Sequence, residues 1–255
     1  MKTIYRLLRE IGFDPRKLIN LAGIPRYFKD MRQFKRKGGN VNLLFPCLND
    51  LKENSGSASG HYFHQDLLVA QKIFKNKPLK HLDVGSRVDG FVAHVAGFRK
   101  IEVIDIRPQK NKIKNIHFLQ GDLVNLSSKF FNKYDSVSSL HTVEHIGLGR
   151  YGDPIDPSGH IKAIENLKMA VKKNGRLYIS VPISSNERVE FNAHRVFNIK
   201  TILSFFDDWK LLSFSYVDDL GSLHENISTS NIDSKNSFNC KWGCGIFEFK
   251  KQNEK

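Results

Sequence analysis

The chain has few cysteines and no long apolar run. Its 255 residues contain three cysteines, too few and too unevenly placed for a disulfide framework. No stretch approaches the ~20 consecutive apolar residues that span a bilayer, and the first residues form an amphipathic pattern rather than the apolar block of a signal peptide. We therefore expect a protein of the reducing cytoplasm. Because 40% of its residues are hydrophobic, it can bury one sizeable core.

Negative charge is scarce at the start of the chain. The formal net charge is +14, and residues 1–40 hold eleven lysines and arginines against three carboxylates, a net charge of +8. A basic surface can contact an anionic membrane or a phosphorylated substrate, or it can simply be a solvated face. Basic and aromatic residues are not interleaved as in segments that stack nucleic-acid bases, so we expect no nucleic-acid partner.

Prolines and glycines divide the first sixty residues into short pieces. Apolar residues at helical spacing over residues 4–11, and prolines at two later helix starts, predict two or three short helices. A run of small polar residues at 54–60 indicates a flexible loop. We expect residues 1–60 to form a basic helical extension ending in that loop, and residues 61–255 to form the main domain.

From residue 61 onwards, short apolar runs alternate with helical stretches. Apolar periodicity predicts helices at 63–74, at 161–172 and near 201–206. The short runs predict five strands and then two closing strands joined by a long polar loop: 81–84, 101–104, 116–119, 134–140, 177–181, 209–217 and 245–250. This alternation predicts an α/β fold, a doubly wound, Rossmann-like sheet of about seven strands with a closing antiparallel hairpin.

Acidic residues follow the first three predicted strands. In a doubly wound sheet a ligand binds beyond the carboxyl ends of the strands, so these loops are where a site is expected. They read Asp83-Val84-Gly85-Ser86-Arg87, then Asp105 at the end of the second strand, then Gly121-Asp122-Leu123. In this arrangement the chain resembles the class I S-adenosylmethionine-dependent methyltransferases over about residues 78–183.

That resemblance implies S-adenosyl-L-methionine as the cofactor. The cofactor-binding residues it implies are Asp83, Gly85, Ser86, Arg87, Asp105, Asp122 and Leu123. Gly85 would let the backbone approach the methionine part, and Asp83 would face the positive charge of the cofactor. Asp105 would accept hydrogen bonds from the ribose hydroxyls. Asp122 would pair with the adenine amino group, with Leu123 as an apolar contact.

The first of these turns departs from the family pattern. Arg87 and Asp89 stand where further glycines are usual, and Gly90 is displaced by one residue. Arg87 would compensate by binding the carboxylate of the cofactor, or it is a partner in a surface ion pair. The same turn disfavours a dinucleotide-dependent oxidoreductase, because a pyrophosphate needs three spaced glycines at a helix start.

The segment after the fourth predicted strand is rich in ionisable residues. Residues 140–160 hold three histidines, three carboxylates and an arginine. Glu144-His145 resembles a pair that lies beside the cofactor in related methyltransferases, and 147–160 is similar to a little-characterised bacterial family linked with surface polysaccharide genes. A general base assists methyl transfer to a hydroxyl, so the expected catalytic residues are His141, Glu144 and His145.

Residues further along supply the expected acceptor pocket. The expected substrate-binding residues are Asp153, Asp156, His160, His194 and Arg195. Arg195 could instead fix its loop by pairing with an acid. Metal ligands are also present, His61 with His64 and Cys240 with Cys244, but the cysteine pair lacks a second pair and we predict no metal site.

The reaction that these expectations describe is methyl transfer. We expect O-methylation of a small-molecule or glycan acceptor, a sugar or sugar-linked group in the biosynthesis of surface polysaccharide. Two alternatives stay open at this point: an RNA methyltransferase, and a non-catalytic protein that binds S-adenosylmethionine.

Overall fold

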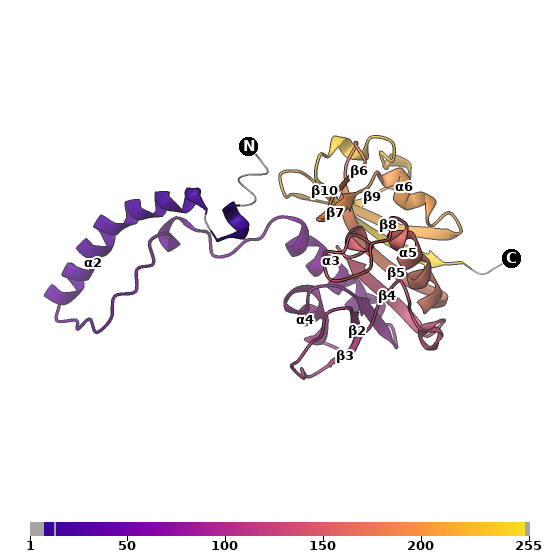
Figure 1. Cartoon of the computed structure of the whole chain (residues 1–255), viewed down its shortest axis with the longest axis horizontal. Helices are drawn as coiled ribbons and strands as arrows, with labels where there is room; N and C mark the ends of the chain where they lie inside the picture. Colours follow the sequence, from indigo (N-terminus) through magenta and orange to yellow (C-terminus); the bar gives the residue numbers. More distant parts are fainter. Residues whose placement is uncertain (1–7, 13, 253–255) are drawn as a thin grey trace. The chain divides into compact units, whose positions relative to one another are not determined.

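The chain divides into two compact units. The computed structural model describes residues 8–12 and 14–252. The first unit is Met1–Ser57 and the second is Ala58–Lys255, so the boundary lies inside the loop of small polar residues (Figure 1). Within the described ranges, no helix is both long enough and apolar enough to cross a membrane.

The first unit consists of short helical segments. A 3₁₀ helix spans Pro15–Gly23 (η1), an α-helix spans Ile24–Arg36 (α2), and a second 3₁₀ turn spans Asp50–Lys52 (η2). Pro25 lies in the first turn of α2, where the amide donor it lacks would have no partner inside the helix. No residue of α2 is buried. The helix predicted over residues 4–11 lies mostly outside the described residues.

The second unit is built on one mixed sheet of eight strands. Their order across the sheet is β3-β2-β1-β4-β5-β10-β8-β9. In chain order they are β1 (His81–Val84), β2 (Ile101–Asp105), β3 (Ile116–Gln120), β4 (Tyr134–Leu140), β5 (Val171–Ile183), β8 (Trp209–Val217), β9 (Leu223–Ile227) and β10 (Gly243–Lys251). β1 to β5 are parallel, whereas β10 is antiparallel to both β5 and β8. Arg188–Glu190 (β6) and His194–Val196 (β7) form a separate hairpin.

Helices cover both faces of the sheet (Figure 1). One apolar cluster joins the sheet to α3 (His61–Asn76) and α4 (Ala93–Ala96), and the other joins it to α5 (Gly159–Ala170) and α6 (Ile199–Ser204). Successive residues of β5 belong to different clusters: Leu177 and Ile179 pack with α5, and Tyr178 packs with α3. Burial on both faces explains why the strands are short, nearly continuous apolar runs in the sequence.

The eighth strand was not predicted. β9 lies in the segment expected to be a polar loop, and it pairs with β8 through Phe214↔Ile227 and Tyr216↔His224. Only two of its five residues, Leu223 and Ile227, are aliphatic. An edge strand with so little apolar alternation gives no clear periodic signal.

The prediction for the end of α5 was wrong. The helix ends at Ala170, and Val171 already belongs to β5. Between Tyr134 and Ser136 of β4, the partner on β5 moves from Val171 to Arg176, so the extra residues bulge out of the ladder. Asn174, with φ of +61°, lies in this bulge. Its Asn-Gly turn therefore interrupts a strand rather than stopping a helix.

The order of the strands reverses between β1 and β4. The chain proceeds from β1 outwards to β2 and β3, and then returns to place β4 on the other side of β1. The loops leaving the carboxyl ends of β1 and β4 therefore diverge, and the crevice between them is where open α/β sheets bind ligands.

Candidate functional site

A cavity of about 550 Å³ opens at this carboxyl edge. Its wall comes from the loops after β1, β2, β3 and β4, with Tyr62 of α3 at one side. The wall includes eight residues predicted from the sequence: Gly85, Arg87, Asp105, Asp122, Leu123, His141, His145 and Asp153. The fold thus brings together residues that are far apart in the chain, as the alternation of strands and helices predicted.

Gly85 is the residue of this wall whose side-chain size matters most. Its φ is +74°, a left-handed conformation that L residues rarely adopt. A Cβ atom at this position would lie 2.3 Å from Thr142 Cγ2. The Gly85 amide donates to the Ile104 carbonyl at 2.8 Å, which fixes the turn against β2. Glycine here lets the turn adopt this conformation and pack closely against Thr142.

Asp83 lies beneath the cavity and not on its wall, which corrects its expected contact with the cofactor. The carboxylate is fully buried and accepts hydrogen bonds from the hydroxyls of Ser86 (2.7 Å) and Ser138 (2.6 Å). Burial raises the pKa of Asp83 to about 7. Ser86 is also buried, and its Oγ accepts from the Leu140 amide at 3.2 Å. The two residues therefore hold the turn after β1 to β4.

Arg87 forms a surface ion pair, which was the alternative to its binding the carboxylate of the cofactor. Its guanidinium donates to both carboxylate oxygens of Asp89, at 3.0 and 2.7 Å, on an exposed part of the rim. It also lies 5.5 Å from the ring centre of Tyr62. In this state the Arg87 side chain is occupied by a surface ion pair.

Asp105 lies on the cavity wall, and hydrogen bonds from Arg107 hold its carboxylate in place. Its Oδ1 accepts from the Arg107 amide at 2.8 Å and from Arg107 Nε at 3.0 Å, and its Oδ2 accepts from the guanidinium at 2.7 Å. Only 12% of the Asp105 side chain is exposed. The Arg107 guanidinium lies 4.5 Å from the ring centre of Tyr151. Asp105 is therefore fixed in place by Arg107 at the end of β2.

Asp122 and Leu123 form the floor beyond β3. The Asp122 carboxylate accepts from the Val124 amide and from the Asn125 side chain, both at 2.8 Å. Leu123 is buried on the cavity wall. A carboxylate beside a buried leucine offers a polar edge and an apolar surface, which suits a flat heterocycle.

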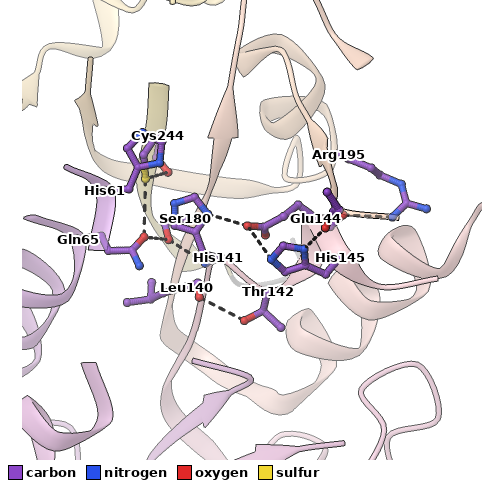
Figure 2. Close-up of polar contacts among 12 residues, drawn as sticks. His61, Gln65, Leu140, His141, Thr142, Glu144, His145, Ser180, Arg195 and Cys244 are labelled. Carbon is purple, nitrogen blue, oxygen red and sulfur yellow. Dashed lines mark hydrogen bonds and ion pairs between the residues drawn. The ribbon is translucent and has the colours of Figure 1, made fainter. Parts of the chain in front are cut away.

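The loop after β4 holds a buried carboxylate between two histidines (Figure 2). Glu144 Oε1 lies 2.6 Å from His141 Nδ1 and 3.7 Å from His145 Nε2. Glu144 itself is fully buried behind the wall, whereas His141 and His145 reach the cavity. All three expected catalytic residues thus form one cluster.

The two histidines differ in charge. Burial opposes protonation of His141, but the Cys244 sulfur and the Glu144 carboxylate outweigh it and raise its pKa well above the usual value. Burial lowers the pKa of His145, so at neutral pH this ring is uncharged. The His145 Nδ1 atom lies 2.6 Å from the Ala193 carbonyl and must carry the proton, which leaves a lone pair on Nε2.

Four of the five expected substrate-binding residues do not line the cavity, and their roles stay predictions. Asp156 binds Ser158 and Lys162 outside it, and His160 packs beside Phe197, where burial lowers its pKa to about 4. His194 pairs with Glu190 on the small hairpin. Asp156 lies in the loop before α5, His160 in the first turn of α5 and His194 on β7, and the sequence pattern does not specify where these segments lie relative to the cavity.

Arg195 fixes its loop, but not through an acid. Its guanidinium donates to the carbonyls of Glu144 (3.4 Å), Ile146 (2.6 Å) and Pro157 (3.2 Å). It therefore ties the segment after β4 to β7, which helps to hold Glu144 in place.

Asp153 does line the cavity, but its carboxylate is engaged locally. It accepts from the amides of Gly147 (2.7 Å), Gly149 (3.3 Å) and Tyr151 (3.2 Å).

Three residues of the wall were not predicted from the sequence: Tyr62, Arg107 and Tyr151. Arg107, two residues after Asp105, carried a signal, because such a spacing allows an ion pair; nothing in the sequence brings Tyr62 to this edge.

Sequence comparison gives one family. A family model described as "Caenorhabditis protein of unknown function, DUF268" matches residues 93–242, more than half of the chain. No curated protein matches by sequence. The expected link to a bacterial family of surface polysaccharide genes is not shown by these comparisons and stays a prediction.

Solved structures share the fold at low identity. The 1,6-didemethyltoxoflavin-N1-methyltransferase of Burkholderia thailandensis, solved with its substrate and S-adenosylhomocysteine, matches with a TM-score of 0.53 and 10% identity, over 94% of this chain and 92% of that one. The N-methyltransferase NodS of Bradyrhizobium japonicum, solved with S-adenosylhomocysteine, matches with a TM-score of 0.50 and 12% identity, over 87% and 98%. The chain therefore has the Rossmann-like fold of these methyltransferases and belongs to the family described as "Caenorhabditis protein of unknown function, DUF268".

Proposed function

We propose that this protein is an S-adenosylmethionine-dependent methyltransferase. The observation that carries the proposal is the meeting of Gly85, Asp105 and Asp122, from three successive strands, on one cavity where the strand order reverses. The two methyltransferases of the same fold that were solved with S-adenosylhomocysteine support it.

The cavity suggests how the cofactor is held. The part of the cavity wall at Gly85 takes the methionine part, and the fixed Asp105 carboxylate accepts hydrogen bonds from the two ribose hydroxyls. Asp122 and Leu123 take the adenine. Arg107 contributes indirectly, because its two hydrogen bonds orient Asp105 before the ribose arrives.

The first prediction separates this cofactor from a dinucleotide. A single glycine in the turn after β1 gives no cradle for a pyrophosphate, so S-adenosylhomocysteine should bind at least about tenfold more tightly than NAD⁺. Isothermal titration calorimetry of the full chain with each ligand measures this. Tighter binding of NAD⁺ would exclude the proposal in favour of a dinucleotide-dependent enzyme.

We further propose that the acceptor is a hydroxyl of a sugar or sugar-linked group, in the biosynthesis of surface polysaccharide. Two tyrosines, Tyr62 and Tyr151, and the guanidinium of Arg150 stand on the wall near His145. Ring faces beside hydrogen-bonding groups suit a polar, flat-sided ligand such as a sugar. His145, uncharged and with a free lone pair, takes the hydroxyl proton as the methyl group transfers.

The basic first unit suggests contact with an anionic membrane. On α2, Ile24, Phe28 and Met31 form one stripe, with Tyr27 and Phe34 at its edge. Arg26, Lys29, Arg32 and Arg36 lie away from that stripe, whereas Lys35, in the last turn, lies within it. An exposed helix with an apolar stripe and a basic face is typical of helices that lie in the surface of anionic bilayers.

The second prediction tests this contact in the full chain. We expect sedimentation with phosphatidylserine vesicles at low salt and loss of it at high salt, because the attraction of exposed charges is screened. The variant with Arg26→Glu, Lys29→Glu, Arg32→Glu and Arg36→Glu should stay in the supernatant.

Phosphatidylcholine vesicles and circular dichroism of the variant are the controls. Equal sedimentation of the variant would refute the membrane proposal. Salt-dependent binding of RNA by the parent chain, with no vesicle binding, would instead favour the RNA methyltransferase.

A further inference from the structure

Three potential metal ligands meet beside the cavity, although the sequence gave no reason to pair them. His61 begins α3, His141 follows β4, and Cys244 lies on β10. One ligand atom from each residue lies within 4.8 Å of the others. Figure 2 shows His61 and Cys244 close together above His141. Residues from three separate elements thus converge on one point next to the carboxyl edge of the sheet.

His141 is held in an unusual way. Its backbone φ is +50°, a left-handed conformation that is uncommon for residues other than glycine, although histidine, asparagine and aspartate adopt it more often than the rest. Its amide donates to the Ser180 carbonyl at 3.0 Å and its Nδ1 binds Glu144 at 2.6 Å, so the strained residue is fixed from both sides. Backbone strain of this kind gathers at functional sites.

The other ring nitrogen of His141 has no partner. Nε2 is buried and makes no hydrogen bond, and the residue as a whole is only 8% exposed. Leaving a buried polar atom unpaired is costly, and a native protein rarely does so without a function. A carboxylate on Nδ1 with a free Nε2 is the arrangement that orients histidine ligands in metal sites.

Hydrogen bonds also orient the side chains of His61 and Cys244. His61 Nε2 lies 3.3 Å from the Trp242 carbonyl, so the ring can bind an ion through its second nitrogen. The Cys244 thiol donates to Gln65 Oε1 at 3.7 Å, and Gln65 Oε1 also accepts from the Ser180 hydroxyl at 2.6 Å. Each of the three side chains is thus oriented by a neighbour.

We propose that His61, His141 and Cys244 bind a Zn²⁺ ion. Two imidazoles and one thiolate are ligands that zinc prefers. As the ion binds, Cys244 releases its thiol proton and the charged His141 ring releases the proton on Nε2, so that both atoms have a free electron pair. Ligand atoms of a tetrahedral zinc site lie roughly 3.3–3.6 Å apart. The His61 and His141 rings are stacked, with their centres 5.2 Å apart and their planes 2° from parallel, so one ring must turn about its side-chain bonds for both nitrogens to point at one ion. Three protein ligands leave the fourth position free, as in catalytic zinc sites. Because His141 also lines the cavity, that position lies beside the proposed acceptor.

This inference stands independently of methyl transfer and is tested without an activity assay. The full chain is purified, stripped with a chelator and titrated with Zn²⁺ in competition with a chromophoric chelator. We expect one tight equivalent. Co²⁺ in place of Zn²⁺ should give a thiolate-to-metal absorption band in the near ultraviolet, which reports the sulfur ligand directly.

Variants identify the ligands. Loss of a residue that only orients a ligand costs 10–100-fold in affinity, so Cys244→Ser and His61→Ala should each weaken Zn²⁺ binding by at least ~100-fold, and Cys244→Ser should abolish the Co²⁺ band. Cys240→Ser and His64→Ala are matched controls, because they stand on the same two segments outside the trio. They should keep both affinity and band.

Folding of each variant is checked by circular dichroism. His61, at the start of α3 and only partly buried, provides a variant that does not disturb the core if Cys244→Ser fails to fold. The proposal is overturned if the parent chain binds no stoichiometric Zn²⁺, or if His61→Ala and a folded Cys244→Ser retain the parent affinity.

Discussion

Replacing Asp105 with alanine is expected to weaken the binding of S-adenosylhomocysteine by at least about tenfold. The carboxylate is mostly buried, fixed by Arg107 and turned to the cavity, so its loss would leave two ribose hydroxyls without their acceptor. A hydrogen bond to a charged group contributes ~1.5–3 kcal/mol, and 1.4 kcal/mol corresponds to a tenfold change in affinity. Isothermal titration calorimetry measures the difference.

Asp135→Ala is the matched control. Asp135 is also a strand carboxylate held by a basic side chain, Lys172, but it lies at the start of β4, at the opposite edge of the sheet. Its loss should leave the affinity unchanged within about twofold, a change below ~0.4 kcal/mol. Unchanged affinity in Asp105→Ala would show that the ribose does not bind at the end of β2.

Most of the sheet could be predicted because its strands are buried on both faces. The runs 81–84, 134–140 and 209–217 became strands with the predicted bounds. β9 could not be predicted in the same way, because it is an edge strand with two aliphatic residues, and its pairing is decided by β8. Whether a short polar segment forms a strand depends more on the strands beside it than on the periodicity of its own sequence.

The cofactor side of the site was more predictable than the acceptor side. Gly85, Asp105 and Asp122 stand at the ends of strands, so the topology alone brings them together. His160 lies in the first turn of α5 and His194 at the start of β7, and neither residue lines the cavity. For Arg195, the sequence showed a basic residue near the site. It did not show that the guanidinium would donate hydrogen bonds to three backbone carbonyls.

The cluster of His61, His141 and Cys244 shows the limit of spacing arguments. Metal sites recognisable from sequence have ligands a few residues apart on one element. Here the ligands come from a helix start, a strand end and the last strand, separated by 80 and 103 residues in the chain. Only the strand order β4-β5-β10 brings Cys244 near His141.

Replacing His145 with alanine is expected to lower turnover by ~10²–10⁴ while the affinity for S-adenosylhomocysteine changes little. His145 is the histidine of the cluster that is uncharged at neutral pH, whereas His141 is held in its charged form by Glu144 and Cys244. Release of S-adenosylhomocysteine, with nucleotide sugars and capsular glycan fragments as acceptors, measures turnover. Calorimetry on the same samples measures cofactor affinity.

The pH profile identifies the base more specifically than the loss of rate. Because burial lowers the pKa of His145, the base is in its active form above that pKa, and the acidic limb of kcat should fall below pH 6.5. This limb should disappear in His145→Ala and persist in His224→Gln, a control on the edge strand β9. A limb that persists in His145→Ala would assign the proton transfer to another group. If no acceptor supports turnover while the cofactor binds, the cavity serves a non-catalytic S-adenosylmethionine-binding protein.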